Sequence, residues 1–178
     1  VDVVIASPNA GPKETPDRPG TGYVTIIIND DATLKRGANP SVKPISSSFS
    51  SPYSGVGVTI QGAQLEGLFG YSVALVDLDA DGISDVVVGA PFDKNVADGA
   101  GLTGSVYVIW GRRNFTEITY TSISDLLTKK RYDAVVQIQL SKSGSFGFSL
   151  SSAGDWDGDG FEDLIVGAKD SSLGPRGR

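Results

Sequence analysis

Residues 77–85 read Asp77-Leu78-Asp79-Ala80-Asp81-Gly82-Ile83-Ser84-Asp85, with acidic residues at the first, third, fifth and ninth positions and glycine at the sixth. The same spacing returns as Asp155-Trp156-Asp157-Gly158-Asp159-Gly160-Phe161-Glu162-Asp163. Each copy runs directly into an apolar segment, Val86-Val87-Val88-Gly89-Ala90 in the first and Leu164-Ile165-Val166-Gly167-Ala168 in the second. Self-similarity of this kind is the signature of a repeat architecture.

The similarity extends to both sides of the acidic stretches. Phe69-Gly70 precedes the first copy and Phe146-Gly147 precedes the second. A third, truncated copy opens the chain, where Asp2-Val3-Val4-Ile5-Ala6-Ser7-Pro8 matches residues 85–91. The interval from Asp2 to Asp85 is 83 residues and that from Asp85 to Asp163 is 78 residues, so the chain holds about two periods and begins and ends within a repeat. Because residue 1 is valine and not methionine, we expect the chain to be part of a longer protein.

One period predicts four β-strands. Two of them are nearly continuous apolar runs, as expected for strands covered on both faces, and the last alternates as a half-buried strand does. The predicted strands are residues 69–76, 85–90, 105–110 and 134–140. Four antiparallel strands per repeat predict an all-β fold made of β-propeller blades. The period is long for such a blade, so we expect surface loops to contain the surplus, at residues 39–55, 93–103 and 112–132.

This reading divides the chain into three parts. Residues 1–62 would form a partial blade holding strands two to four, residues 63–140 one complete blade, and residues 141–178 a partial blade holding strands one and two. We expect Phe69 and Phe146 to fill the core between blades, with Gly70 and Gly147 allowing close backbone approach. Tyr107 and Trp110 are likewise expected to pack within the blades.

Composition excludes several function classes. The chain has no histidine and no cysteine, which removes Ser-His-Asp catalysis, thiolate nucleophiles and disulfides. Its net charge of -6, with the basic residues scattered, argues against a nucleic-acid partner. No apolar stretch is long enough to predict a membrane span. We therefore expect a protein that is not an enzyme and that binds neither nucleic acid nor, through this segment, a membrane.

The acidic stretches predict calcium sites. Calcium takes six to eight oxygen ligands, and alternating carboxylates in a tight loop converge on one point. Glycine at the sixth position permits the turn, and the seventh residue would offer its main-chain carbonyl. The predicted Ca²⁺ ligands are Asp77, Asp79, Asp81, Ile83 and Asp85 in one loop and Asp155, Asp157, Asp159, Phe161 and Asp163 in the other.

Two alternatives apply to these loops. An EF-hand needs a glutamate at position 12 and flanking helices, but position 12 is Val88 in one loop and Val166 in the other, each within a predicted strand. A solvated acidic turn without metal is the second alternative, because aspartate and glycine are common in turns. Two loops with identical spacing after the same Phe-Gly entry favour the metal site over that alternative.

Together these motifs resemble the FG-GAP repeat of integrin α subunits. The resemblance rests on Phe69-Gly70, residues 77–85 and Gly89-Ala90-Pro91, and again on Phe146-Gly147, residues 155–163 and Gly167-Ala168. In detail the chain is similar to the long-period FG-GAP repeats of secreted or surface proteins of bacteria, algae and protists. The resemblance implies calcium that stabilises the blades and has no catalytic role. Lys169 stands where the motif has proline, and the second loop lies one residue further from its Phe-Gly than the first.

Three functions are compatible with this resemblance. The first is an extracellular or cell-surface adhesion or recognition propeller, whose partner is a protein or glycan ligand. The second is a structural repeat of a surface filament, coat or appendage, in which copies of the protein bind each other. The third is an accessory propeller of a secreted hydrolase. Asn114-Phe115-Thr116 matches the N-glycosylation sequon, which suits an extracellular glycoprotein.

Overall fold

A computed structural model of the chain describes residues 3–11, 20–27, 57–95, 101–112, 122–130, 133–140 and 144–169. The predicted loop at residues 39–55 and the sequon at Asn114 lie outside these residues. The described elements are β1 (Val3–Ser7), β2 (Tyr23–Ile27), β3 (Gly57–Gln61), β4 (Ser72–Val76), β5 (Asp85–Ala90), β6 (Lys94–Asn95), β7 (Gly101–Leu102), β8 (Ser105–Ile109), α1 (Ile123–Thr128), β9 (Val135–Gln139), β10 (Ser145–Gly154) and β11 (Asp163–Lys169).

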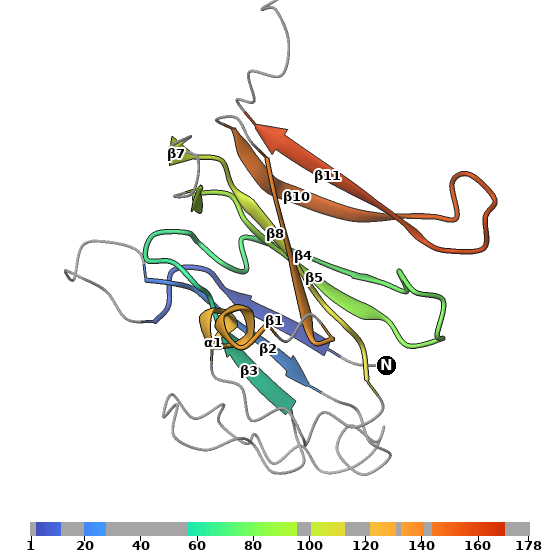
Figure 1. Cartoon of the computed structure of the whole chain (residues 1–178), viewed down its shortest axis with the longest axis horizontal. Helices are drawn as coiled ribbons and strands as arrows, with labels where there is room; N and C mark the ends of the chain where they lie inside the picture. The colour runs from blue at the N-terminus through green and yellow to red at the C-terminus, as the bar shows by residue number, and fades with distance from the viewer. Residues whose placement is uncertain are drawn as a thin grey trace, which may run out of the picture.

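Three antiparallel sheets form the body of the structure (Figure 1). The first sheet has the strand order β1-β2-β3, the central sheet has the order β4-β5-β8-β9, and β10 pairs with β11 in the C-terminal hairpin. Within each of these sheets, every pair of neighbouring strands is antiparallel. The prediction of an all-β fold is confirmed, and the central sheet has the four antiparallel strands of one propeller blade.

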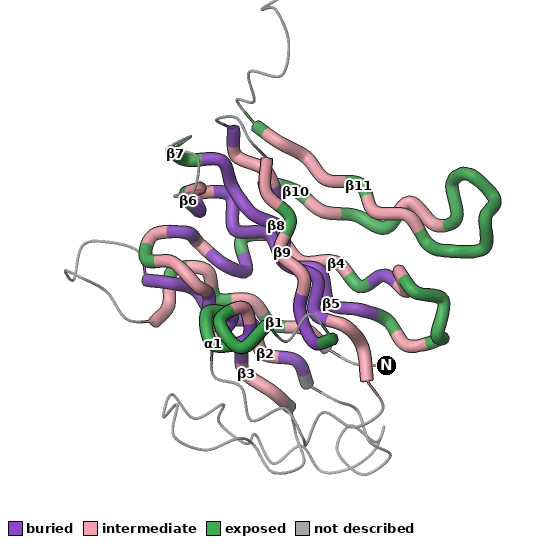
Figure 2. Tube along the Cα trace, in the orientation of Figure 1, coloured by how far each residue is buried: buried purple, intermediate pink, exposed green. Residues whose placement is uncertain are grey.

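Two hydrophobic clusters lie between the sheets. The larger one joins the first sheet to one face of the central sheet and includes Val24, Ile60, Phe69, Val88 and Tyr107. The smaller one lies on the opposite face of the central sheet and packs against the apolar side chains of β10 and β11. Strands β5 and β8 are buried along their whole length, which places the central sheet between its neighbours (Figure 2). The sheets are therefore stacked face to face, as propeller blades are.

The same main-chain contact joins both pairs of neighbouring sheets. The N–H of Phe69 donates to the carbonyl of Thr21 at 3.3 Å, and the N–H of Phe146 donates to the carbonyl of Thr103 at 3.2 Å. Glycine follows threonine in both cases, with φ of 84° at Gly22 and 75° at Gly104. A Cβ at Gly22 would lie 2.1 Å from the carbonyl oxygen of Phe69, and one at Gly104 would lie 2.3 Å from that of Phe146. These positions exclude any side chain.

The aromatic residues of the repeat pack as expected. Phe69 is 1% exposed, and its ring lies edge-on to that of Tyr107 with centroids 5.5 Å apart. Trp110 and Phe146 are partly buried against the smaller cluster. Gly70 approaches the first sheet so closely that a Cβ there would lie 3.1 Å from Val24 Cγ2. The predicted packing roles of these residues are confirmed.

Two of the predicted loops contain regular structure. Residues 123–128 form the helix α1, and Ser122 caps its N-terminus by accepting from the N–H of Ser124 at 3.1 Å. Ile123 and Leu126 are buried in the larger cluster, and this burial holds the short helix against the sheet. Within residues 93–103, β6 and β7 pair over two residues each. The prediction of a surface loop at residues 112–132 was wrong at residues 123–128, which form this helix.

The extra residue before the second acidic loop lies in a β-bulge. Strands β4 and β5 pair in one continuous register from Ser72↔Gly89 to Val76↔Asp85. Strands β10 and β11 shift register between Ser152 and Gly154, so that one extra residue is inserted in β10 before the loop. The bulge lets the second loop keep the geometry of the first despite its longer approach from the Phe-Gly pair.

Candidate metal site

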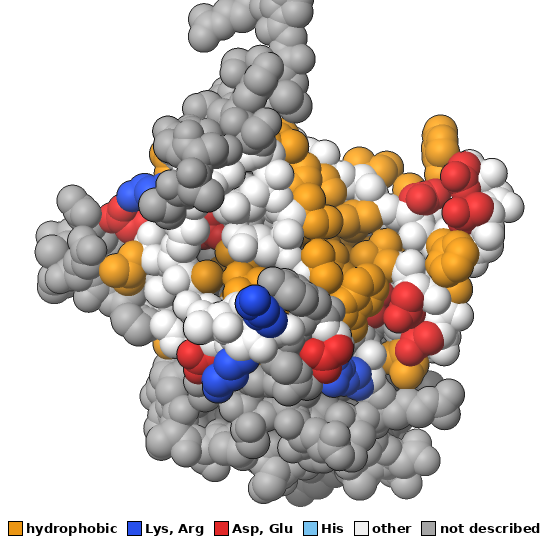
Figure 3. Space-filling view, in the orientation of Figure 1, with side chains coloured by type: hydrophobic (Ala, Val, Ile, Leu, Met, Phe, Trp, Pro, Cys, Tyr) orange, Lys and Arg blue, Asp and Glu red, His pale blue; other side chains and the backbone are white. Residues whose placement is uncertain are grey.

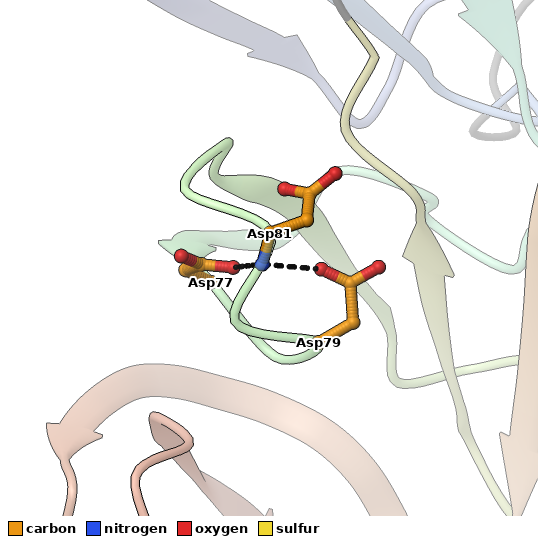
Figure 4. Close-up of side chains that lie close together, drawn as sticks. All are labelled: Asp77, Asp79 and Asp81. Atoms are coloured by element: carbon orange, nitrogen blue, oxygen red, sulfur yellow. Dashed lines mark hydrogen bonds between the residues drawn. The ribbon is translucent and has the colours of Figure 1, made fainter.

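The first aspartate loop, residues 77–85, closes the hairpin between β4 and β5. Asp77 accepts from the N–H of Asp81 at 3.1 Å through Oδ1, a bond that Figure 4 shows. It also accepts from the N–H of Gly82 at 3.0 Å through Oδ2. Asp79 Oδ1 also accepts from the Asp81 N–H at 3.2 Å, and Asp81 Oδ1 accepts from that of Ile83 at 2.8 Å. Aspartate side chains that bond to nearby N–H groups in this way fold the chain into successive turns.

The second aspartate loop, residues 155–163, repeats this arrangement between β10 and β11. Asp155 accepts from the N–H of Asp159 at 3.0 Å and from that of Gly160 at 3.0 Å. Asp157 accepts from Asp159 at 3.1 Å, and Asp159 accepts from Phe161 at 2.9 Å. The glycines at the sixth position have φ of 81° at Gly82 and 96° at Gly160, in the left-handed region that favours glycine.

Three carboxylates converge in each loop. Oxygen atoms of Asp77, Asp79 and Asp81 lie within 4.8 Å of one another, and so do those of Asp155, Asp157 and Asp159. All six residues are exposed except Asp77, which is half-buried. Figure 3 shows the acidic side chains of both hairpin tips on the same side of the molecule. The structure therefore brings six of the predicted ligand residues together in two groups of three, one in each loop.

Asp85 and Asp163, at the ninth positions, have a further role that the sequence did not indicate. Asp85 is 1% exposed, and its two oxygens accept from the N–H groups of Leu78 at 2.9 Å and Gly111 at 2.7 Å. Asp163 accepts in the same way from the N–H of Trp156 at 2.8 Å. Burial raises the pKa of Asp85, while the two backbone hydrogen bonds oppose that increase. Each ninth-position aspartate thus closes its loop against the second residue, and neither belongs to the three-carboxylate group.

The donor set fits a hard divalent cation. Two oxygens that each lie about 2.3–2.6 Å from a calcium ion are at most about 5 Å apart, and the three carboxylates of each loop meet that limit. Carboxylate oxygen is the ligand that such ions prefer, whereas softer transition metals favour the nitrogen and sulfur ligands that this chain lacks. The loop N–H groups that point at the same oxygens offset part of the carboxylate repulsion and hold the side chains in place.

A buried carboxylate outside the loops was not predicted from the sequence. Asp93 follows β5 and is 1% exposed. Its Oδ2 accepts from the hydroxyl of Tyr107 at 2.5 Å, and the Ser105 hydroxyl also bonds to it. Gln137 donates to Tyr107 and to Ser105, both at 3.1 Å. The main-chain carbonyl of Asp93 accepts from residues 103 and 104, so this network joins the turn after β5 to β8 and β9.

Burial raises the pKa of Asp93 from 3.8 to about 6, and the hydrogen bonds from Tyr107 and Ser105 oppose that increase. In the unfolded chain the carboxyl ionises near its ordinary pKa, whereas in the folded chain it stays protonated until about pH 6. The folded state therefore binds more protons between these values, and its stability falls as pH rises from about 4 to 6. A difference of about two pKa units corresponds to about 3 kcal/mol at most.

We expect Asp93→Asn to remove this part of the pH dependence. The free energy of unfolding of the native chain, measured by urea titration in chelator from pH 4 to 7, should fall relative to that of the variant by about 2–3 kcal/mol. Asp125→Asn, which removes an exposed carboxyl in the first turn of α1, is the matched control. A ¹³C titration of the Asp93 carboxyl gives a second test, with an expected midpoint near 6. The raised pKa of Asp93 would be contradicted if the unfolding free energies of the native chain and of Asp93→Asn changed in parallel with pH and the ¹³C midpoint of Asp93 lay near 4.

Comparison with known proteins agrees with the repeat structure. The family model of the FG-GAP repeat matches residues 69–109 and 146–178, which include both aspartate loops. Integrin alpha-PS5 of Drosophila melanogaster is 37% identical over 107 residues, covering 60% of this chain and 9% of the relative. Integrin alpha-6 of Homo sapiens is 35% identical over 117 residues, covering 64% of this chain and 9% of the relative. Integrin alpha pat-2 of Caenorhabditis elegans is 38% identical over 112 residues, covering 62% of this chain and 8% of the relative.

Stacked antiparallel sheets, one of them with the four strands of a complete blade, and an acidic loop between the first two strands of that sheet define a β-propeller repeat protein. The matched motifs specify the class further: the chain carries FG-GAP repeats that are similar to those of integrin α subunits. It spans about a tenth of the length of the curated relatives that it matches. Among the described residues, no helix has the length and apolar character that crossing a bilayer requires.

Proposed function

We propose that this chain is part of a calcium-stabilised extracellular recognition propeller, without catalytic activity, whose partner is a protein or glycan. The observation that carries the proposal is the pair of loops in which three carboxylates converge with the same hydrogen bonds. The integrin α relatives support an adhesion role. We propose the same division into blades as the sequence predicts, with residues 63–140 forming the complete one.

Within each loop the residues would have distinct roles. The carboxylates of positions one, three and five would hold the ion, namely Asp77, Asp79 and Asp81 or Asp155, Asp157 and Asp159. The main-chain carbonyls of Ile83 and Phe161 and the carboxylates of Asp85 and Asp163 would complete the two sites. Calcium would supply positive charge that cancels the repulsion among the carboxylates. Because each loop closes a hairpin between the first two strands of a blade, fixing the loop stabilises the pairing of those strands.

The calcium affinity of such sites also bears on where the protein works. Calcium modules outside the cell bind with dissociation constants of roughly 10⁻⁴ to 10⁻³ M, which is weak compared with intracellular sensors. Exposed loops that each hold three converging carboxylates fit that regime, because solvent competes for the ligands. An extracellular or cell-surface location follows from this proposal and agrees with the integrin relatives.

Light scattering on the native protein that carries these repeats tests the proposal. With calcium present, we expect a discrete particle whose molar mass stays constant over a range of protein concentrations. With excess chelator, we expect the same mass but a lower unfolding temperature, because calcium supports folding and does not hold copies together. Very large polymers that fall apart in chelator would support a structural filament or coat instead. Indifference of both mass and folding to chelator would refute the calcium proposal.

A further inference from the structure

One side chain of the second aspartate loop reaches the first. Glu162 Oε2 accepts from the N–H of Asp77 at 3.2 Å, and the N–H of Glu162 donates to the carbonyl of Asp77 at 3.4 Å. Both main-chain hydrogen-bonding groups of Asp77 are therefore held by a single residue 85 positions away. The hydroxyl of Ser152, on β10, lies 3.5 Å from the same carboxylate oxygen. Glu162 thus bridges two sheets at the tips of their hairpins.

The repeat pattern does not require a glutamate at this position. The eighth residue of the first loop is Ser84, and the carboxylates that converge in each loop come from its first, third and fifth positions. Glu162 is not part of the three-carboxylate group of either loop. Its position is set instead by contact with the neighbouring hairpin, which points to a role between the loops.

Both partners of this contact control the geometry of a loop. Asp77 is the first residue of the three-carboxylate group, and its side chain accepts from the N–H groups of Asp81 and Gly82. Glu162 directly precedes Asp163, which closes the second loop by accepting from the N–H of Trp156 at 2.8 Å. A continuous path of covalent and hydrogen bonds therefore runs from the carboxylates of one loop to the closing bond of the other.

We propose that Glu162 is a positioning residue that couples cation binding at the two loops, a proposal that rests on the calcium function proposed above. Ordering of the second loop fixes the main chain at Glu162 and thereby the main chain and carboxylate of Asp77. Linkage is reciprocal, so filling either loop raises the affinity of the other by the same factor. Because the bridging hydrogen bonds are exposed, we expect a factor of about five, at the lower end of the usual range for such coupling.

Nuclear magnetic resonance with calcium alone as the titrant can follow the two loops separately. The amide of Gly82 donates within the first loop and that of Gly160 within the second, so each resonance reports one loop. The double variant Asp157→Asn with Asp159→Asn weakens the second loop selectively. In the otherwise native chain, we expect this double variant to raise the calcium midpoint of Gly82 about five-fold.

Variants of Glu162 identify the bridge. Glu162→Ala keeps the main-chain hydrogen bond to the Asp77 carbonyl but loses the side-chain bond to the Asp77 N–H, so disabling the second loop should change the Gly82 midpoint much less than five-fold. Glu162→Gln keeps an oxygen acceptor for Asp77 and should retain part of the coupling, whereas Asp125→Ala, on α1, should retain all of it. These differences separate positioning from general stability, since thermal unfolding temperatures measured in chelator should be similar for all three variants.

The outcomes distinguish the two proposals. If neither glycine responds to calcium, the proposed calcium function fails. If both respond but the Gly82 midpoint ignores the state of the second loop, the sites are independent and the coupling inference is refuted. Coupling that persists undiminished in Glu162→Ala would also refute it, since Glu162 would not be the link.

Discussion

Replacement of Phe69 by alanine is expected to lower the free energy of unfolding by about 3–5 kcal/mol. Phe69 is 1% exposed in the cluster between the first and central sheets, and its ring lies edge-on to Tyr107. A Cβ at Gly62 would lie 2.4 Å from the Cβ of Phe69, so the main chain of the first sheet already lies against this side chain. Truncation leaves a cavity that rigid strands on both sides do not readily fill.

The matched control for this prediction is Phe161→Ala. Phe161 is 46% exposed and lies in the second aspartate loop, so its truncation should cost less than about 1 kcal/mol. Both variants are compared with the native chain by urea unfolding in chelator, so that any change in ion binding is removed from the measurement. Equal losses for the two variants would mean that Phe69 does not carry the contact between the sheets.

Saturating calcium is expected to raise the free energy of unfolding by about 5 kcal/mol. At a free concentration a hundred times the dissociation constant, each site contributes about 2.7 kcal/mol, and the part of the chain that the structure describes has two candidate sites. For a chain of 178 residues the unfolding temperature should rise by roughly 10–20 °C. Differential scanning calorimetry in 10–100 mM calcium chloride, roughly a hundredfold over the expected dissociation constants, compared with chelator in sodium chloride of matched ionic strength, measures this difference.

Single substitutions in the loops should lower the stability in calcium but not in chelator. Asp79→Asn and Asp157→Asn each keep a side-chain oxygen that accepts from the fifth residue of the loop, but each removes one converging charge. In calcium, each variant should lose about half of the stabilisation. In chelator, each should be as stable as the native chain or slightly more stable, because repulsion falls. Destabilisation by equal amounts in both conditions would indicate a structural aspartate and contradict metal binding.

The strands were predicted well where local and tertiary requirements agree. Residues 85–90 form β5 as predicted, because a run of β-branched residues between an aspartate and a Gly-Ala pair suits a strand buried on both faces. Strand β4 begins at Ser72, three residues later than predicted, because Phe69 and Gly70 lie in a turn in which Gly70 has φ of 91°. Helix α1 was missed, although its Ser122 cap and the three-residue spacing of Ile123 and Leu126 were visible signals.

The candidate site was predictable to the extent that it is local. Alternation of aspartates within nine residues predicted that four carboxylates converge in each loop, and the structure brings the first three of them together. Asp93 stands alone in the sequence, and its partner Tyr107 comes from a strand 14 residues away, so no short pattern marks it. Glu162 contacts a residue 85 positions away, across the junction of two sheets. Such contacts depend on how repeats stack, which spacing within one repeat does not specify.

The glycines at the junctions between sheets have a consequence for how such arrays can grow. At Gly22 and Gly104 the main chain of one sheet touches the main chain that enters the next, at Phe69 and Phe146, without an intervening side chain. A repeat that is copied therefore carries both halves of the joint with it, and the copy fits its neighbour whatever its outer loops contain. Selection can then diversify the loops while the spacing between neighbouring sheets stays constant, because main-chain atoms and not side chains set that spacing.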